Sequence, residues 1–177
     1  MSRGFSLHVV VEQAATPSQL DQIRELFREY AASLPIDLGY QGFAAELATL
    51  PGVYAPPQGR LWLALVNGIA AGCIALRPLT GDICELKRLY VRPPFRNDGL
   101  GWHLASRLIA EATAIGYQLM RLDTLPSMQQ AIRIYERLGF TRCAPYYPTP
   151  IAETIFMERR LMPQSTPTAS VVKDNEP

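Results

Sequence analysis

The sequence predicts an α/β protein of the α+β kind, with a mixed, mostly antiparallel central sheet of about seven strands flanked by helices. Short apolar runs bounded by glycine, proline and asparagine indicate strands, and longer segments with apolar residues at steps of three and four indicate helices. The order of these segments is also informative, because three strands in the middle of the chain follow one another closely. Such strands pair antiparallel, whereas the later strands are separated by helices.

The N-terminal third is predicted to contain one strand followed by helical segments. An apolar run over 6–12 indicates the strand, and Thr-Pro-Ser at 16–18 signals the start of a helix over 17–33. The apolar residues of that helix form one stripe, which we expect to cover the sheet. Proline and glycine then interrupt the pattern, so a shorter helix over about 40–50 and an irregular stretch up to residue 59 are expected.

Three strands follow, over 61–66, 69–76 and 82–91. The first two are separated by Asn67-Gly68, a pair that the two-residue type I′ turn favours because both positions need positive φ. The third strand ends at Arg92-Pro93-Pro94, since proline has no N–H to donate to a neighbouring strand. Three antiparallel strands are therefore expected side by side.

The third of these strands has an irregular apolar pattern. Its apolar positions are Cys84 and Leu86, then Leu89 and Val91, so the two-residue period slips between 86 and 89. A β-bulge is the simplest explanation. The bulge would separate this strand from the parallel strand expected over 118–123 and leave backbone groups unpaired. It would also place on one face the side chains of Glu85, Arg88 and Tyr90.

The C-terminal half is predicted to alternate helices and strands. A helix over 100–114 ends at Gly116, where a glycine can adopt the left-handed conformation of a helix stop. A second helix begins at Ser127 and is closed by Gly139. The remaining strands are expected over 118–123, 140–143 and 153–161.

Length and composition indicate one globular domain. The 177 residues are 48% hydrophobic and 19% charged, which is typical of a folded domain with a sizeable core. We expect this domain to cover 1–162. The segment 163–177 has too few apolar residues to offset the entropy of ordering, so a flexible C-terminal tail is expected there.

Charge and cysteine usage exclude several function classes. The net charge is +1, from 17 basic and 16 acidic residues, so nucleic acid is not an expected partner. The chain has no long apolar run and starts without an apolar leader, so no membrane association and a cytoplasmic location are expected. The three cysteines lack the spacing of a metal site or a disulfide framework, and we expect buried free thiols and no metal. The chain is expected to be a monomer or a homodimer.

The stretch from Val91 to Gly101 is the most informative, because a strand end leads through a glycine-containing turn into a helix. The first N–H groups of a helix lack acceptors and lie at the positive end of its dipole, so they bind phosphate readily. Gly99 and Gly101 would let phosphates approach closely. A dinucleotide fingerprint would need a glycine at Leu104, and a nucleotide-triphosphate loop would need Gly-Lys-Ser/Thr, which is missing.

With these residues the chain resembles the GNAT superfamily of N-acetyltransferases, over roughly 5–161. The family signature Arg/Gln-x-x-Gly-x-Gly/Ala is matched by Arg96, Gly99 and Gly101, and the segment 131–140 looks like the second family motif. The resemblance implies a GNAT-like fold and the transfer of an acetyl group from acetyl-CoA to a primary amine. The acceptor would be a small molecule or a peptide, and the transfer would be direct.

The resemblance also implies where coenzyme A binds. In the family, the amides of the glycine turn hold the pyrophosphate, and the backbone of the preceding strand pairs with the pantetheine arm much as another strand would. The second motif often starts with asparagine where this chain has Met128, which affects a cofactor contact. The cofactor-binding roles fall here to Leu89, Tyr90, Val91, Arg96, Asn97, Asp98, Gly99, Leu100 and Gly101.

Two residues are candidates for acid–base catalysis. An amine is mostly protonated at neutral pH, so a base must remove a proton before the thioester is attacked, and Glu85 is the candidate base. The alternative for Glu85 is a solvated strand residue paired with Lys87 or Arg88. The resemblance places at Tyr135 a tyrosine that donates to the departing thiolate; the alternative is a ring packed in the core. No acyl-enzyme is required, because both substrates can be held together.

The acceptor site is expected to involve Tyr30, Arg88 and Tyr146, although aromatic residues also fill cores and stiffen loops. Trp62 and Trp102 are expected to be packing residues. Two other functions remain open. One is a non-catalytic sensor or scaffold that binds acyl-CoA with the same fold, and the other is a nucleotide-binding or redox domain that uses the glycine turn for a different phosphate ligand.

Overall fold

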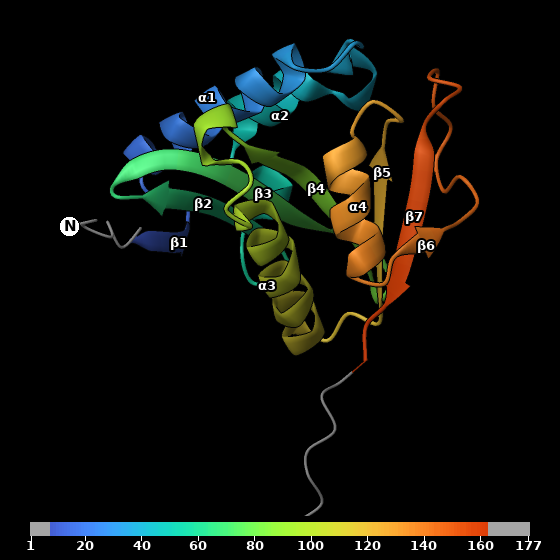
Figure 1. Ribbon diagram of the computed structural model, residues 1–177. Helices are drawn as coiled ribbons and strands as arrows, with labels where there is room; N and C mark the ends of the chain where they lie inside the picture. The colour runs from blue at the N-terminus through green and yellow to red at the C-terminus, as the bar shows by residue number, and fades with distance from the viewer. Residues whose placement is uncertain (1–7, 163–177) are drawn as a thin grey trace, which may run out of the picture.

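The computed structural model describes residues 8–162, and within them seven strands form one sheet in the order β1-β2-β3-β4-β5-β7-β6 (Figure 1). Neighbouring strands are antiparallel except β4 and β5, which are parallel. The predicted fold class and order of elements are therefore confirmed. The strands are β1 (Val9–Gln13), β2 (Arg60–Val66), β3 (Ile69–Thr80), β4 (Ile83–Val91), β5 (Leu119–Thr124), β6 (Thr141–Arg142) and β7 (Ile155–Arg160).

Helices cover both faces of this sheet (Figure 1). The helices are α1 (Pro17–Ala32), α2 (Phe43–Thr49), α3 (Leu100–Ile115) and α4 (Gln129–Arg137), and short 3-10 helices are η1 (Leu38–Gln41), η2 (Gly52–Tyr54) and η3 (Pro93–Phe95). One core lies between the sheet and α3, around Leu104 and Leu108, and a second lies between the sheet and α1, around Ile23 and Phe27. All four side chains are fully buried. The two cores follow from the alternation of side chains along β2 to β4.

The turn and cap signals of the sequence are confirmed. Thr16 caps α1 in a reciprocal capping box with Gln19. Asn67 and Gly68 join β2 to β3 with φ angles of 50° and 80°, as a type I′ turn requires. Gly116 ends α3 with a φ of 110°.

The start of α4 is a correction to the sequence-based prediction. The helix begins at Gln129 and not at Ser127, because the chain first makes a turn in which the Met128 N–H donates to the Leu125 carbonyl at 2.9 Å. The tail predicted over 163–177 lies outside the described residues.

The predicted β-bulge of β4 is confirmed. Ala75 and Cys73 of β3 pair with Lys87 and Tyr90, so two residues of β4 face one residue of β3 between these pairs. The first of the two bulged residues, Arg88, has a φ of 58°, which is uncommon for a residue with a side chain. The bulge therefore lies inside the interval from 86 to 89 where the apolar period slips.

β4 separates from β5 after Glu85, ahead of the bulge, and does not pair with it again beyond the bulge. Within residues 8–162 the two strands pair from Ile83 and Leu119 only as far as Glu85 and Arg121. The rest of β4 keeps β3 as its neighbour and turns an open edge towards the gap, as predicted. Gly72 of β3 allows this pairing to be close, because a Cβ atom there would lie 2.6 Å from the Tyr90 carbonyl oxygen.

Candidate functional site

A groove of about 1110 Å³ lies where β4 separates from β5. Its walls come from the end of β4, the first turn of α3, one side of α4 along its length and the end of α1. Asp98 is exposed and does not line it. The structure brings the other predicted cofactor residues together in its lining, namely Leu89, Tyr90, Val91, Arg96, Asn97, Gly99, Leu100 and Gly101.

The turn before α3 has the geometry of an anion site. Asn97 and Gly99 have φ angles of 75° and 77°, and Gly99 is the N-cap residue with no side-chain group capping the helix. The first helical hydrogen bond runs from the His103 N–H to the Gly99 carbonyl at 2.9 Å. The N–H groups of residues 100–102 belong to the first turn of this 16-residue helix and come before that bond, so they have no acceptor within the helix. Such free amides, at the positive end of the helix dipole, suit a pyrophosphate.

Gly101 has a second role, in packing. A Cβ atom there would lie 3.1 Å from Cδ1 of Ile134, so glycine permits the close approach of α3 and α4. Arg96 braces the same turn, because its Nε donates to the Val91 carbonyl at 2.8 Å and its guanidinium lies 5.7 Å from the centre of the Tyr90 ring. The turn is thus held against the end of β4.

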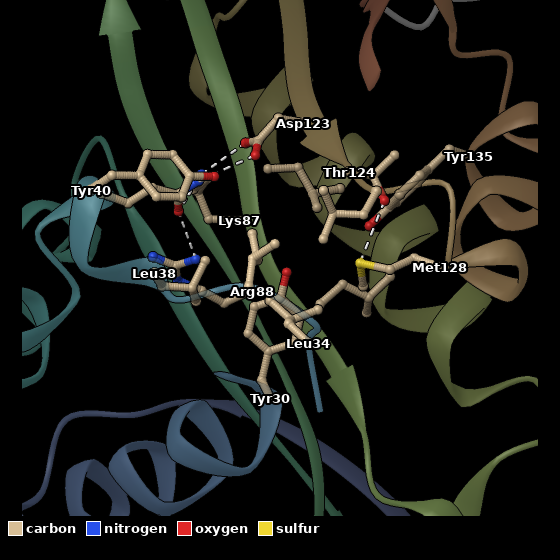
Figure 2. A pocket seen from close by; sticks show the side chains of 15 residues that line it. Tyr30, Leu34, Leu38, Tyr40, Lys87, Arg88, Asp123, Thr124, Met128 and Tyr135 are labelled. Atoms are coloured by element: carbon tan, nitrogen blue, oxygen red, sulfur yellow. Dashed lines mark hydrogen bonds and ion pairs between the residues drawn. The ribbon is translucent and has the colours of Figure 1, made fainter. Parts of the chain in front are cut away.

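A second, much smaller cavity of about 20 Å³ adjoins the groove at the bulge (Figure 2). Tyr30, Leu34, Leu89 and Met128 line both spaces. Met128 is the N-cap residue of α4 and caps it with no side-chain hydrogen bond; its sulfur contacts the Thr124 hydroxyl at 3.6 Å. The residue that departs from the family motif therefore lies at the junction of the two spaces.

Tyr135 lines the small cavity from α4 (Figure 2). Its side chain is buried, and its ring makes an edge contact with Phe140 at a centroid distance of 5.8 Å. Burial raises the pKa of Tyr135 well above its usual value, so the hydroxyl stays protonated at neutral pH. The ring thus packs in the core while the residue also borders the cavity, and its role as the acid stays a prediction.

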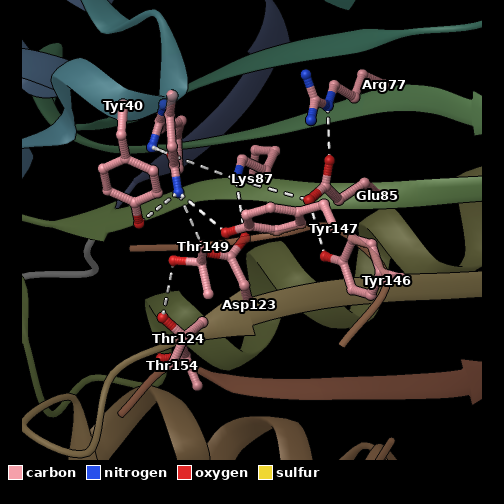
Figure 3. A network of polar contacts seen from close by, with 12 residues as sticks. Tyr40, Arg77, Glu85, Lys87, Asp123, Thr124, Tyr146, Tyr147, Thr149 and Thr154 are labelled. Atoms are coloured by element: carbon pink, nitrogen blue, oxygen red, sulfur yellow. Dashed lines mark hydrogen bonds and ion pairs between the residues drawn. The ribbon is translucent and has the colours of Figure 1, made fainter. Parts of the chain in front are cut away.

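Glu85 lies in a buried polar network (Figure 3). Its carboxylate accepts from Arg77 Nε at 2.6 Å and from the Tyr146 hydroxyl at 2.8 Å, and lies 3.6 Å from Lys87 Nζ. Glu85 has no exposed surface, so the alternative of a solvated strand residue is wrong. It lines neither the groove nor the small cavity, and its role as the base stays a prediction.

Lys87 and Asp123 form a close ion pair at the small cavity, with Nζ 2.8 Å from Oδ1 (Figure 2). Burial favours a higher pKa for Asp123, but the charge of Lys87 and hydrogen bonds from Lys87 and Tyr147 outweigh it and lower the pKa below its usual value. The Asp123 carboxylate is therefore ionised at neutral pH. Among residues 8–162, it is the only carboxylate in the lining of this cavity.

Arg88 and Tyr30, two of the residues predicted for the acceptor site, both line the small cavity. Arg88 Nη2 donates to Glu46 Oε2 at 2.8 Å, and the guanidinium lies 5.9 Å from the centre of the Tyr30 ring. The third predicted acceptor residue, Tyr146, is not brought to the cavity. It packs against Phe156 and donates to Glu85 instead.

Several residues of the two spaces were missed by sequence reasoning. Trp102 was expected to pack in the core, but it is 47% exposed and lines the groove, because the first turn of α3 faces the opening. Asp123 ends the strand predicted over 118–123, so its position near the separation of β4 from β5 could have been predicted. Gln41 and Lys87 gave no signal, since their positions depend on how η1 meets the bulge.

Two classes of site are not found in the described part of the chain. No helix within residues 8–162 combines the length and apolar character needed to cross a membrane. No group of three or more histidine, cysteine, aspartate or glutamate side chains in that range is placed to hold a metal ion.

Comparison with known proteins gives consistent relatives. The model of the Acetyltransferase (GNAT) family matches residues 20–140. An uncharacterized N-acetyltransferase of Schizosaccharomyces pombe is 37% identical over 152 residues, which are 85% of this chain and 93% of the relative. The uncharacterized N-acetyltransferase YjgM of Escherichia coli is 36% identical over 121 residues, which are 67% of this chain and 71% of the relative.

The fold has matching neighbours among solved structures. A GNAT-family acetyltransferase from Staphylococcus aureus superposes with a TM-score of 0.73 and 22% identity, covering 88% of this chain and all of that one. The sequence match over most of the chain, the fold, and the glycine turn at the N-terminus of α3 agree with one another. The chain therefore belongs to the GNAT family of acetyltransferases and is an acetyl-CoA-dependent acyltransferase.

Proposed function

We propose that the protein transfers the acetyl group of acetyl-CoA directly to a primary amine bound in the small cavity. The observation that carries this proposal is the junction of the two spaces at the bulge, where both are lined by Leu89 and Met128. A thioester lying along the open edge of β4 would arrive at that junction. An acceptor amine in the small cavity would then be next to it, and holding both substrates together supplies much of the acceleration.

The groove fits the pyrophosphate and the pantetheine arm of coenzyme A. The amides at 97–101 receive the pyrophosphate, and the open edge of β4 at 89–91 receives the amide groups of the pantetheine arm. Asp98 contributes at most its backbone, because its side chain is exposed outside the groove. Trp102 offers an exposed aromatic face beside the phosphate turn, which suits stacking on the adenine base.

The cysteines support direct transfer over an acyl-enzyme. Cys73 and Cys84 are buried, and burial raises the pKa of the Cys84 thiol to about 12. Cys143 is partly exposed, which corrects the expectation that all three thiols are buried. None of the three lines the groove or the small cavity. The amine nitrogen therefore attacks the acetyl carbonyl itself, an N–C bond forms, and the C–S bond breaks.

The protons of this reaction have two nearby partners. Asp123 lines the cavity and is ionised, so it can take the proton from the amine, whose nitrogen becomes more acidic as the N–C bond forms. Tyr135 is protonated and can donate to the thiolate as it leaves. The predicted base Glu85 is connected to Asp123 through Lys87, at 3.6 Å and 2.8 Å from the Nζ atom. We assign Glu85 to positioning Lys87 and Asp123 to proton transfer.

Replacing the two carboxylates separately tests this assignment. Asp123→Asn is expected to lower kcat by about 100-fold or more, and Glu85→Gln by about tenfold, because only Asp123 borders the acceptor. The dissociation constant for acetyl-CoA, from calorimetry, should change in neither variant. A larger loss in Glu85→Gln than in Asp123→Asn would return the base role to Glu85.

The proposed function is tested by thiol release from acetyl-CoA with purified protein and a panel of amino acids, polyamines, aminoglycosides and short peptides. We expect release that depends on one class of amine, with the acetylated amine identified by mass spectrometry. Family membership favours transfer over a sensor role. Tight coenzyme A binding with no transfer to any amine would reverse that preference.

A further inference from the structure

The side-chain amide of Gln41 lies at the centre of the polar half of the small cavity. Its oxygen Oε1 accepts from Arg88 Nη1 at 3.0 Å and lies 3.5 Å from Lys87 Nζ. Its nitrogen Nε2 donates to the Tyr40 hydroxyl at 3.0 Å and to Asp123 Oδ2 at 3.3 Å. One end of the amide therefore faces two cations, and the other end faces a carboxylate.

The Gln41 amide is neutral, although its oxygen faces two cations and its nitrogen faces a carboxylate. The Gln41 oxygen carries no net charge, whereas a carboxylate between Lys87 and Arg88 would add a Coulombic attraction to both cations. An ammonium group would likewise gain more than an amide nitrogen at Asp123. The two positions are separated by the length of one amide group, which matches the spacing of the amino and carboxylate groups in an α-amino acid.

The size of the cavity requires some side chain to make room for an acceptor. A free volume of about 20 Å³ holds about one water molecule. Gln41 comes from the short helix η1, between Asp37 at its N-cap and Gly42, whose φ is 71°, whereas Lys87, Arg88 and Asp123 come from the sheet. Of these groups, Gln41 is the one whose displacement leaves the sheet intact.

From these contacts we propose that the acceptor is a free amino acid that takes the place of the Gln41 amide. Its carboxylate lies between Lys87 and Arg88, and its amino group lies at Asp123. This inference rests on the acetyl transfer proposed above and names the class of its acceptor. Leu34, Ile36 and Leu38 also line the cavity, and they receive the amino-acid side chain.

Other amines fit this site less well. A polyamine carries no anion, so it would add positive charge beside Lys87 and Arg88. A peptide with a free N-terminus has its terminal carboxylate several residues away. The carboxylate site is close to the amine site, because the single side-chain amide of Gln41 contacts both Arg88 and Asp123. The acceptor must therefore carry both groups within a few ångströms.

The first test uses the unaltered protein and matched acceptors. Thiol release is measured with each of the common amino acids, with its carboxamide, and with the amine left after removal of the carboxylate. We expect at least one amino acid with a kcat/KM about 100-fold above that of its carboxamide, because a neutral carboxamide adds no negative charge beside the two cations and turns N–H donors towards them. Equal or better transfer to the carboxamide or to the decarboxylated amine would overturn the inference.

The second test removes Arg88 from the proposed carboxylate site without leaving an unpaired buried charge. The double variant Arg88→Met/Glu46→Gln removes both members of an ion pair, and we expect its KM for the amino acid to rise at least about tenfold while its acid-to-amide preference disappears. The control is Arg60→Met/Glu111→Gln, which removes an ion pair of 2.7 Å that borders neither space. A preserved acid-to-amide preference in the Arg88 variant would contradict the proposed position.

The outcomes separate this inference from the proposed function. Transfer to polyamines, peptides or other amines, with no turnover of any amino acid and no thermal stabilisation by one in the presence of coenzyme A, would remove the amino-acid inference and keep the acetyltransferase. Coenzyme A binding with no transfer to any amine and no stabilisation by any amino acid would remove both.

Discussion

Gly99→Glu is expected to abolish measurable binding of acetyl-CoA, with a loss of affinity of at least about 100-fold. Gly99 is the N-cap of α3, and a Cβ atom there would meet no heavy atom within 4 Å, so a glutamate side chain has room. Its carboxylate would occupy the free amides of the first turn and repel the pyrophosphate, at about 4 kcal/mol for two unit charges 4 Å apart near a protein surface. Isothermal titration calorimetry with coenzyme A measures the loss.

Gly99→Ala is the matched control for this variant. Gly99 has a φ of 77°, a conformation that costs about 1 kcal/mol for a residue with a side chain, so some destabilisation is expected from backbone strain alone. The alanine variant has that strain without the negative charge. We expect it to melt at a temperature similar to that of Gly99→Glu and to keep its affinity for coenzyme A within about tenfold. Equal affinities in the two variants would show that the phosphates bind elsewhere.

The fold could be predicted from the sequence because its signals are local. The Asn67-Gly68 turn, the capping residue Thr16 and the stop at Gly116 each act within a few residues. The bulge could be predicted for the same reason, since the apolar period of β4 slips where Arg88 and Leu89 together face one residue of β3. The turn proposed to receive the phosphates is also contiguous in the chain, which is why its residues could be named.

The small cavity proposed for the acceptor could be predicted only in part, because its residues come from distant segments. Gln41 of η1 meets Lys87 and Arg88 of β4 and Asp123 of β5, and no pattern within any one segment indicates the others. Glu85 was placed on the correct face of the sheet. The residue pattern of β4 could not reveal that Arg77 and Tyr146 bind the Glu85 carboxylate away from both spaces.

Tyr135→Phe is expected to lower kcat by about 100-fold, within the range that a positioned general acid contributes, and to leave the dissociation constant for acetyl-CoA unchanged. The hydroxyl matters mainly when the C–S bond breaks and negative charge develops on sulfur, so its removal acts on the transition state and not on the bound substrate. The phenylalanine ring keeps the edge contact with Phe140, so the fold of α4 is expected to persist. Single-turnover kinetics and calorimetry measure the two quantities separately.

Tyr117→Phe is the control that separates catalysis from the loss of a buried hydroxyl. Tyr117 is buried and donates to the Gln58 carbonyl at 2.9 Å, and it borders neither the groove nor the small cavity. Its replacement should lower the stability by about 1 kcal/mol, as for a typical hydrogen bond, and leave kcat unchanged. A fall in kcat confined to Tyr135→Phe, with acetyl-CoA still bound, would identify the Tyr135 hydroxyl as the group that protonates the leaving thiolate. Equal kcat values in the two variants would leave Tyr135 a packing residue.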